Sequence, residues 1–151
     1  MAHEILDEIR HFTEQLVERA GLELDVSVEP NQDQVVVELS GPDTDLVLTE
    51  NARLLHGMNH LVSQIFYRKA QGQYRFVVDC SGYRARRHRE LELLAAKAAE
   101  EAQRSGRPFH FQAMPASDRR IIHLCLADQR EVRTESDGRG MHRRVVVIPE
   151  P

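Results

Sequence analysis

The change from helical to alternating hydrophobic spacing at Gly21 constrains the fold more than any other feature of this sequence. Between residues 2 and 20 the apolar side chains recur at helical intervals, and glycine is a common helix terminator. The stretches LELDVSVEP and DQVVVELSG then alternate apolar and polar residues on either side of the turn EPNQD, which predicts a β-hairpin. A helix joined directly to a hairpin favours an α+β fold.

The rest of the chain continues this mixture of elements. The spacing predicts a helix over residues 53–68, a strand at QYRFVVDC and a long helix from SGYR to about Gln103, ended by Gly106. A brief strand at FHFQAM, a helix from about Pro115 to Ala127 and a hairpin turning at SDGRG follow. The predicted order is α-β-β-α-β-α and then β-α-β-β, with the second group packed on the shared long helix. We expect the core side of the 53–68 helix to contain Leu54, Leu55, Met58, Leu61, Val62, Ile65 and Phe66.

The composition indicates a folded protein with one ordinary domain or two small ones, because 41% of its 151 residues are hydrophobic. No apolar run approaches the roughly 18 residues that span a bilayer, and the N-terminus is polar and acidic. We therefore expect a cytoplasmic protein without membrane insertion. Cys80 and Cys125 lie beside hydrophobic residues and form no CxxC pair, so we expect both to be reduced packing residues.

The net charge of −4 is unevenly distributed along the chain. Residues 1–81 contain 6 Lys and Arg against 14 Asp and Glu, whereas residues 82–151 contain 14 against 10. The first segment therefore carries −8 and the second +4, so a polyanion should meet the C-terminal half. Only two of the 20 basic residues are lysine, which fits phosphate recognition by guanidinium groups and, equally, a GC-rich genome.

The histidine pair in HGMNH matches only part of a zinc-hydrolase motif. His56 and His60 share one helix face, but Gly57 stands where the general base would be, and no third ligand follows at a recognised spacing. We interpret both histidines as solvated side chains opposite the core. The sequence also contains no nucleophile elbow, no P-loop and no dinucleotide fingerprint. We therefore expect no enzyme activity, no metal and no cofactor.

The strongest candidate site is the stretch DRRIIH. On a helix Arg119 and His123 are neighbours at i and i+4, and Arg120 flanks them. The same spacing predicts that Ile121, Leu124 and Cys125 pack on the far side, with Ile122 at the border. Further arginines that can extend this cationic surface come from the end of the helix and the adjoining hairpin: Arg130, Arg133, Arg139, Arg143 and Arg144.

Two interpretations of this stretch are equally supported by the pattern. Guanidinium forks suit phosphate oxygens and stack on bases, so the surface fits a nucleic acid. Alternatively, Arg119 and His123 tie the helix to the sheet by pairing with carboxylates such as Asp118 or Glu135. In the first case the imidazole predicts pH-sensitive binding.

The segment GYRARRHRELELLAAKAAEEAQRSGRPFHFQAMPASDRRIIHLCLAD, followed by SDGRGMHRRVVVIP, resembles bacterial Jag (SpoIIIJ-associated) proteins. These proteins join a KH domain to the domain named for Arg, three residues and His (R-3-H). The resemblance implies a KH-like domain over residues 1–82 and an R-3-H domain over residues 83–151 that includes the connecting helix. It also implies that Arg119 and His123 contact single-stranded nucleic acid. Family members often carry an additional N-terminal Jag domain, whereas this sequence begins at the helix before the expected KH sheet.

The sequence departs from the family pattern at the loop with which KH domains hold the nucleic-acid backbone. That loop has the form Gly-x-x-Gly, because glycines allow close approach to phosphates. The register places it at Thr49, Glu50, Asn51 and Ala52, so both glycines are absent and a negative charge is present. Glu50 would repel phosphate by about 1 kcal/mol if solvent-exposed. We therefore expect a degenerate loop.

The resemblance and the residues together predict a non-enzymatic bacterial protein that binds single-stranded RNA or DNA, with RNA favoured. The residues expected to carry binding are Arg119, His123, Arg120, Arg143 and Arg144. The acidic KH-like half is then a scaffold or a surface for a protein partner. The alternative function is a protein–protein interaction scaffold whose KH half has lost nucleic-acid binding.

Overall fold

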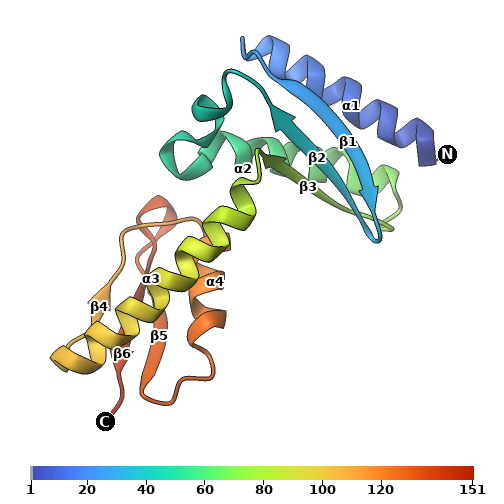
Figure 1. The fold of residues 1–151 in the computed structure, drawn as a ribbon. Coiled ribbons are helices and arrows are strands. Elements are labelled where there is room, and N and C mark those ends of the chain that lie inside the picture. Colours follow the sequence, from blue (N-terminus) through green and yellow to red (C-terminus); the bar gives the residue numbers. More distant parts are fainter. Residues whose placement is uncertain (1) are drawn as a thin grey trace. The chain divides into compact units, whose positions relative to one another are not determined.

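The computed structural model describes residues 2–151 and divides the chain into two compact units, the first ending at Arg84 and the second beginning at Ala85 (Figure 1). The first unit contains α1 (Ala2–Arg19), β1 (Asp25–Asn31), β2 (Gln34–Ser40), α2 (Thr44–Lys69) and β3 (Arg75–Cys80). The second contains most of α3 (Tyr83–Ser105), then β4 (Phe109–His110), α4 (Ala116–Leu126), β5 (Val132–Asp137), the 3-10 helix η1 (Gly140–His142) and β6 (Arg144–Pro149). The predicted α+β class and order of elements are confirmed.

The first unit packs α1 and α2 against a three-stranded sheet. Its strand order is β1-β2-β3, with β1 antiparallel and β3 parallel to β2. Strand β2 alternates as predicted, and its inward residues Val35, Val37 and Leu39 are fully buried. Phe66 of α2 joins them to α1, because its ring lies 5.7 Å from that of Phe12 between centroids.

The predicted core face of α2 is partly wrong. Leu55, Val62 and Phe66 are buried, but three other predicted core residues are 37–43% exposed: Leu54, Leu61 and Ile65. The apolar residues cover a wider arc of this helix than the sheet can bury, so tertiary contacts select the buried part. The buried face of α2 is therefore rotated relative to the predicted one. His56, which we expected to be solvated, is partly buried, while His60 is exposed.

Helix α2 is interrupted at the four residues where the degenerate loop was predicted. Thr49 is extended (φ −63°, ψ 161°), and Glu50, Asn51 and Ala52 have φ values of 51°, 58° and 55°. These three residues are left-handed, a conformation in which a Cβ atom costs about 1–2 kcal/mol per residue. A short helical turn therefore precedes this break, and the predicted 53–68 helix follows it.

The second unit packs α3 and α4 on a sheet of order β4-β6-β5, whose neighbouring strands are antiparallel. Its core joins Leu91 and four alanines of α3 to Ile122 of α4 and to Val145 and Val147 of β6. Small alanine side chains allow a close approach between helix and sheet. The expectation that this sheet packs on the long helix is confirmed.

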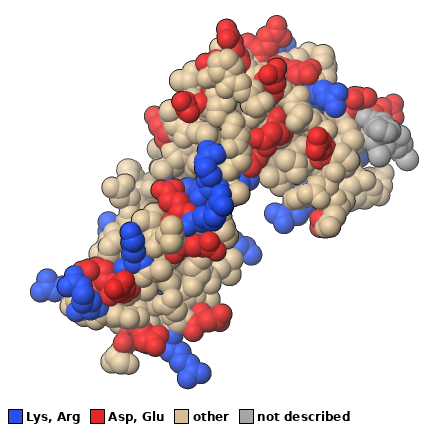
Figure 2. Space-filling view, viewed as in Figure 1, with Lys and Arg blue, Asp and Glu red and all other residues tan. Residues whose placement is uncertain are grey.

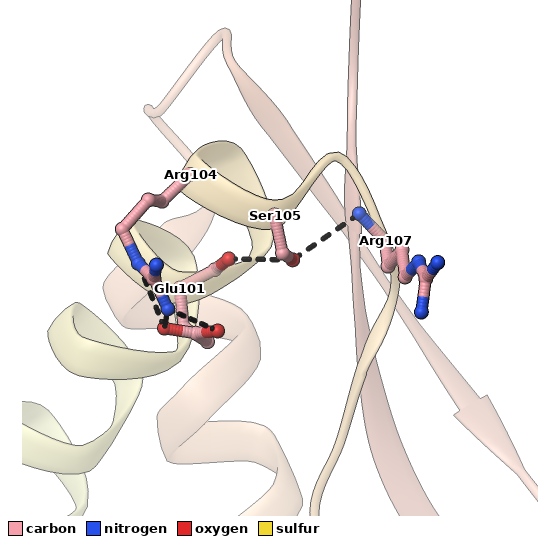
Figure 3. Close-up of polar contacts among 4 residues, drawn as sticks. All are labelled: Glu101, Arg104, Ser105 and Arg107. Carbon is pink, nitrogen blue, oxygen red and sulfur yellow. Dashed lines mark hydrogen bonds and ion pairs between the residues drawn. The ribbon is translucent and has the colours of Figure 1, made fainter.

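The predicted ends of α3 and of the last hairpin turn are also observed. After Ser105, Gly106 has a φ of +65°, and the Ser105 hydroxyl donates to the Glu101 carbonyl (2.8 Å) and accepts from the Arg107 amide (Figure 3). Between β5 and β6, Gly138 has a φ of +89°. A Cβ atom at Gly138 would lie 2.7 Å from the His142 carbonyl oxygen, so the turn requires glycine.

We expect Glu50→Gly to raise the free energy of unfolding by about 1 kcal/mol, because glycine relieves the left-handed strain at this exposed position. Arg53→Gly is the matched control: it removes the same exposed Glu50–Arg53 ion pair (3.7 Å) but lies in the helical part of α2. That change should lower stability by about 1 kcal/mol. Urea denaturation measures both, and destabilisation by Glu50→Gly would contradict the conformation described for this break.

Candidate functional site

Arg119 and His123 of α4 meet at one hydroxyl group on β5. The Arg119 guanidinium Nη1 donates to Ser136 Oγ (3.0 Å), and His123 Nε2 lies 2.9 Å from the same oxygen. The other ring nitrogen, Nδ1, lies 2.6 Å from Thr134 Oγ1. The i and i+4 pair predicted from the sequence is therefore held by two hydroxyls that protrude from the strand beneath it.

The environment of His123 favours its neutral form. Burial, and then the neighbouring Arg119 charge, lower the pKa of the imidazole below its usual value of 6.5. When the ring is neutral, Ser136 can accept from Arg119 and donate to Nε2, which leaves Nδ1–H to donate to Thr134. Protonation would require the Ser136 hydroxyl to stop donating to the ring.

Arg119 also connects α4 to the segment that precedes β6. Its Nε donates to the Met114 carbonyl (3.3 Å), and the Met114 amide donates to the Arg143 carbonyl (3.0 Å). This bond places the backbone of Arg143 next to the site. Arg143 is exposed, so its side chain is accessible to solvent. Among the described residues no group accepts from Nη2 of Arg119, so this half-buried guanidinium retains donors for a ligand.

The predicted packing face of α4 is wrong in detail. Asp118, Ile122 and Leu126 are buried, whereas Leu124 is 63% exposed. The carboxylate of Asp118 accepts from Arg87 Nε of α3 (2.9 Å), and the two side chains are 5% and 19% exposed. This buried ion pair lets a charged residue occupy the core face, so the helix is rotated relative to the pattern of apolar residues.

Arg87 is shared between two carboxylates. Its Nη1 donates to Glu90 Oε2 at 2.8 Å, in addition to the contact with Asp118. Burial by itself would lower the pKa of the guanidinium, but hydrogen bonds and charge interactions with Glu90 and Asp118 raise it overall. The first turn of α4 is therefore fastened to α3 by a permanently charged group.

The remaining candidate arginines are distributed over both faces of the sheet. Arg120 is exposed beside Arg119 on α4. Arg144 lies opposite Asp137 in the β5–β6 register and bonds to its carboxylate at 3.4 Å, on the sheet face away from α4. Arg133 is on that same face and pairs with Glu135 and Glu150. Arg130 lies beyond the end of α4 at Leu126.

The hydroxyls that hold the pair were not singled out from the sequence, although a signal was present. In VRTESD the strand alternation places Thr134 and Ser136 on the same face as the buried Val132. Polar side chains on the inward face of a strand are expected to hydrogen-bond to the helix that covers that face. The interpretation in which Arg119 and His123 tie the helix to the sheet expected carboxylate partners, whereas the partners observed are two hydroxyls and, for Arg119, the Met114 carbonyl.

The break in α2 presents a negative charge at a helix terminus. Glu50 precedes the helical residues 53–69, and its side chain is 75% exposed. The negative charge therefore lies near a helix terminus, the kind of position that otherwise favours an anionic ligand. Ala52 is completely buried, so its methyl group fills space at the end of the break.

The charge distribution follows the two units. On the face drawn in Figure 2, Asp and Glu are more numerous than Lys and Arg over the first unit, whereas basic side chains gather along the early turns of α3. Residues 1–84 contain 7 basic and 14 acidic residues, and residues 85–151 contain 13 and 10. Arg119 and His123 therefore lie in the unit with the positive balance.

Three further features of residues 2–151 concern metal ligands, thiols and membrane spans. Within that range no group of three or more His, Cys, Asp or Glu is arranged to hold a metal ion. Cys80 and Cys125 are thiols outside any disulfide; Cys80 is buried, and burial together with Glu92 raises the pKa of the Cys125 thiol. None of the helices described is long and apolar enough to cross a membrane.

Comparison with known proteins finds an R-3-H domain and relatives that are named RNA-binding proteins. The R-3-H domain family matches residues 89–149. Proteins named RNA-binding protein KhpB from Clostridium symbiosum and Bacillus subtilis are 31% and 26% identical over 93% and 94% of this chain. A third KhpB, from Lactiplantibacillus plantarum, is 27% identical over 87% of this chain. The matches cover 64%, 69% and 41% of the three proteins, so the chain spans only part of their length. The resemblance to the Jag family is confirmed.

We expect Asp118→Ala to lower the free energy of unfolding by about 3 kcal/mol, because it leaves a mostly buried guanidinium with one partner fewer. Glu90→Ala is the matched control, since it removes the other, 57% exposed partner of Arg87 and should cost less than about 1 kcal/mol. Guanidinium chloride denaturation of the two variants distinguishes them. Equal losses would show that the Arg87–Asp118 pair contributes no more to the free energy of unfolding than the exposed Arg87–Glu90 pair does.

Proposed function

We propose that this chain, which is related to the Jag family and carries an R-3-H domain, binds single-stranded nucleic acid in the cytoplasm without catalysing a reaction. RNA is the favoured ligand, because the curated relatives are named RNA-binding proteins. Residues 85–151 make the main contact, with Arg119 and His123 leading and Arg120 and Arg143 assisting. Arg144 takes a lesser part from the other sheet face.

The observation that carries this proposal is the arrangement of Arg119 and His123 around Ser136. The shared hydroxyl fixes both side chains, so less conformational entropy is lost when a phosphate binds. The Arg119 guanidinium keeps unused donors, and such donors form strong charge-assisted bonds with phosphate oxygens. Tying α4 to β5 and contacting a ligand are therefore compatible roles for the same two residues.

We assign the first unit, a degenerate KH-like domain in this proposal, a minor part in nucleic-acid binding. Thr49, Glu50, Asn51 and Ala52 include no glycine, and Glu50 places a negative charge at the helix terminus. The unit contains 7 basic and 14 acidic residues, which disfavours a polyanion over its whole surface.

A second candidate function is a protein-interaction scaffold. The exposed row Leu54, Leu61 and Ile65 on α2 favours it, because neighbouring apolar side chains on a helix surface are typical of contact surfaces. In this case the acidic first unit binds a protein partner. Absence of RNA binding at low salt would support this second function.

We expect Arg119→Ala/His123→Ala to weaken binding of a labelled mixed-sequence single-stranded RNA by about tenfold or more, because phosphate contacts dominate such affinities. The slope of log affinity against log salt should also fall by about 1. Fluorescence anisotropy at two salt concentrations measures both quantities.

Arg104→Ala is the matched control for this double variant. Arg104 is 72% exposed and pairs with Glu101 within α3 (Figure 3), so its removal deletes one positive charge without touching the α4–β5 contact. Its affinity should stay close to that of the wild type. If both variants lose binding equally, overall charge rather than the Arg119–His123 arrangement carries the interaction.

Affinity should increase as the pH falls from about 8 to about 5.5. The free His123 has a pKa below 6.5 and is neutral at pH 7, whereas an adjacent phosphate favours the charged ring. Binding then takes up a proton, so the affinity for RNA rises as the pH falls. Anisotropy titrations across this range test it with His123→Gln as the control, and a wild-type profile as flat as that of the variant would refute it.

A further inference from the structure

We propose that the outer edge of β5 holds a nucleotide base by hydrogen bonds from the backbone of Thr134, beside the phosphate contact at Arg119. This inference rests on the proposed function and adds a base contact to it. Strand β5 is the last in the order β4-β6-β5, so one of its edges has no neighbouring strand among the residues described.

The register identifies which backbone groups face that edge. The Phe111 amide donates to the Val145 carbonyl (3.0 Å), so Val145 directs its backbone groups toward the β4 side of β6. In an antiparallel sheet the backbone groups of successive residues point to opposite edges of the strand. Residues 144, 146 and 148 of β6 therefore direct their N–H and C=O groups toward β5. The Glu150 amide follows the same pattern, because it donates to the Glu131 carbonyl (2.8 Å). The β5 partners of residues 144, 146 and 148 are Arg133, Glu135 and Asp137. Thr134 and Ser136 consequently direct their N–H and C=O groups away from β6.

The same two residues hold the proposed phosphate-binding pair. Their hydroxyls contact His123 and Arg119 on the helix side of the sheet, while their backbone groups face outward at the edge. A donor and an acceptor on one residue match the Watson–Crick or Hoogsteen edge of a splayed base, which also presents a donor beside an acceptor.

The edge strand of the first unit provides a contrast within the same chain. At β3 the Val78 amide donates to Asn59 Oδ1 (2.8 Å), and the Val78 carbonyl accepts from Arg84 Nε (2.9 Å). The Ser63 hydroxyl donates to the Phe76 carbonyl (3.3 Å). Side chains thus occupy the β3 edge, as proteins commonly do to prevent unwanted pairing. No described side chain makes a comparable bond to the backbone of Thr134.

Thr134→Pro tests the base contact. Proline removes the outward N–H without removing a ladder bond to β6, which edge strands tolerate. The full chain is titrated with a single-stranded RNA and with an abasic ribose-phosphate chain of the same length. The wild type should prefer the RNA by about tenfold, a factor typical of one bidentate base contact. Thr134→Pro should lose that preference, whereas Thr134→Val, which lacks only the hydroxyl, should keep it.

An ester in place of the Thr134 amide removes the same N–H with the side chain intact, and it decides the question if the proline variant does not fold. A preference for RNA that survives the ester would overturn the base contact while leaving the proposed function in place. Failure of the wild type to bind either chain would remove both. The chain could instead form a dimer that Thr134→Pro disrupts and Thr134→Val does not, while the preference for RNA is unchanged. That result would assign the edge to a β-strand of a second copy and would also overturn the proposal.

Discussion

The buried ion pair between Arg87 and Asp118 is the interaction on which the arrangement of the second unit depends. It joins the first turn of α4 to α3; the Asp118 side chain is only 5% exposed, and that of Arg87 is 19% exposed. An uncompensated buried carboxylate is costly, so rotations of α4 that separate it from Arg87 are disfavoured. With Asp118 facing α3 and the core, Arg119 and His123 are directed to β5.

The orientation of α4 links packing to the proposed binding chemistry. Ser136 fixes Arg119 and His123 together, and its neighbour Thr134 fixes the second ring nitrogen. The partial burial that allows these bonds is also what lowers the pKa of His123. The free protein therefore favours a neutral imidazole beside a permanent cation. In the proposed function, a phosphate would bind to a preorganised guanidinium and to a ring that gains its charge in the complex.

The order of elements could be predicted because hydrophobic periodicity depends on local sequence. Gly21, Gly106 and the turn at Gly138 mark boundaries that the structure keeps. The rotation of α2 and α4 could not be predicted in the same way. Apolar residues cover more of each helix than is buried, so Leu54 and Leu124 are exposed while Asp118 is not.

The position of the candidate pair followed from helical spacing, but its partners did not. Arg119 and His123 are neighbours on any helix, so the sequence was sufficient to associate them. Their contact with Ser136 depends on how α4 lies over β5, which is a tertiary property. The left-handed conformation of Glu50 and Asn51 was equally inaccessible, since neither is a glycine.

Ultraviolet crosslinking of single-stranded RNA to the full chain, followed by mass spectrometry of the adducts, tests the location of the binding surface most directly. Adducts are expected on α4 around Arg119 and His123, on β5 and near Arg143, with none at residues 49–52. Adducts at residues 49–52 together with an unmodified second unit would contradict this assignment.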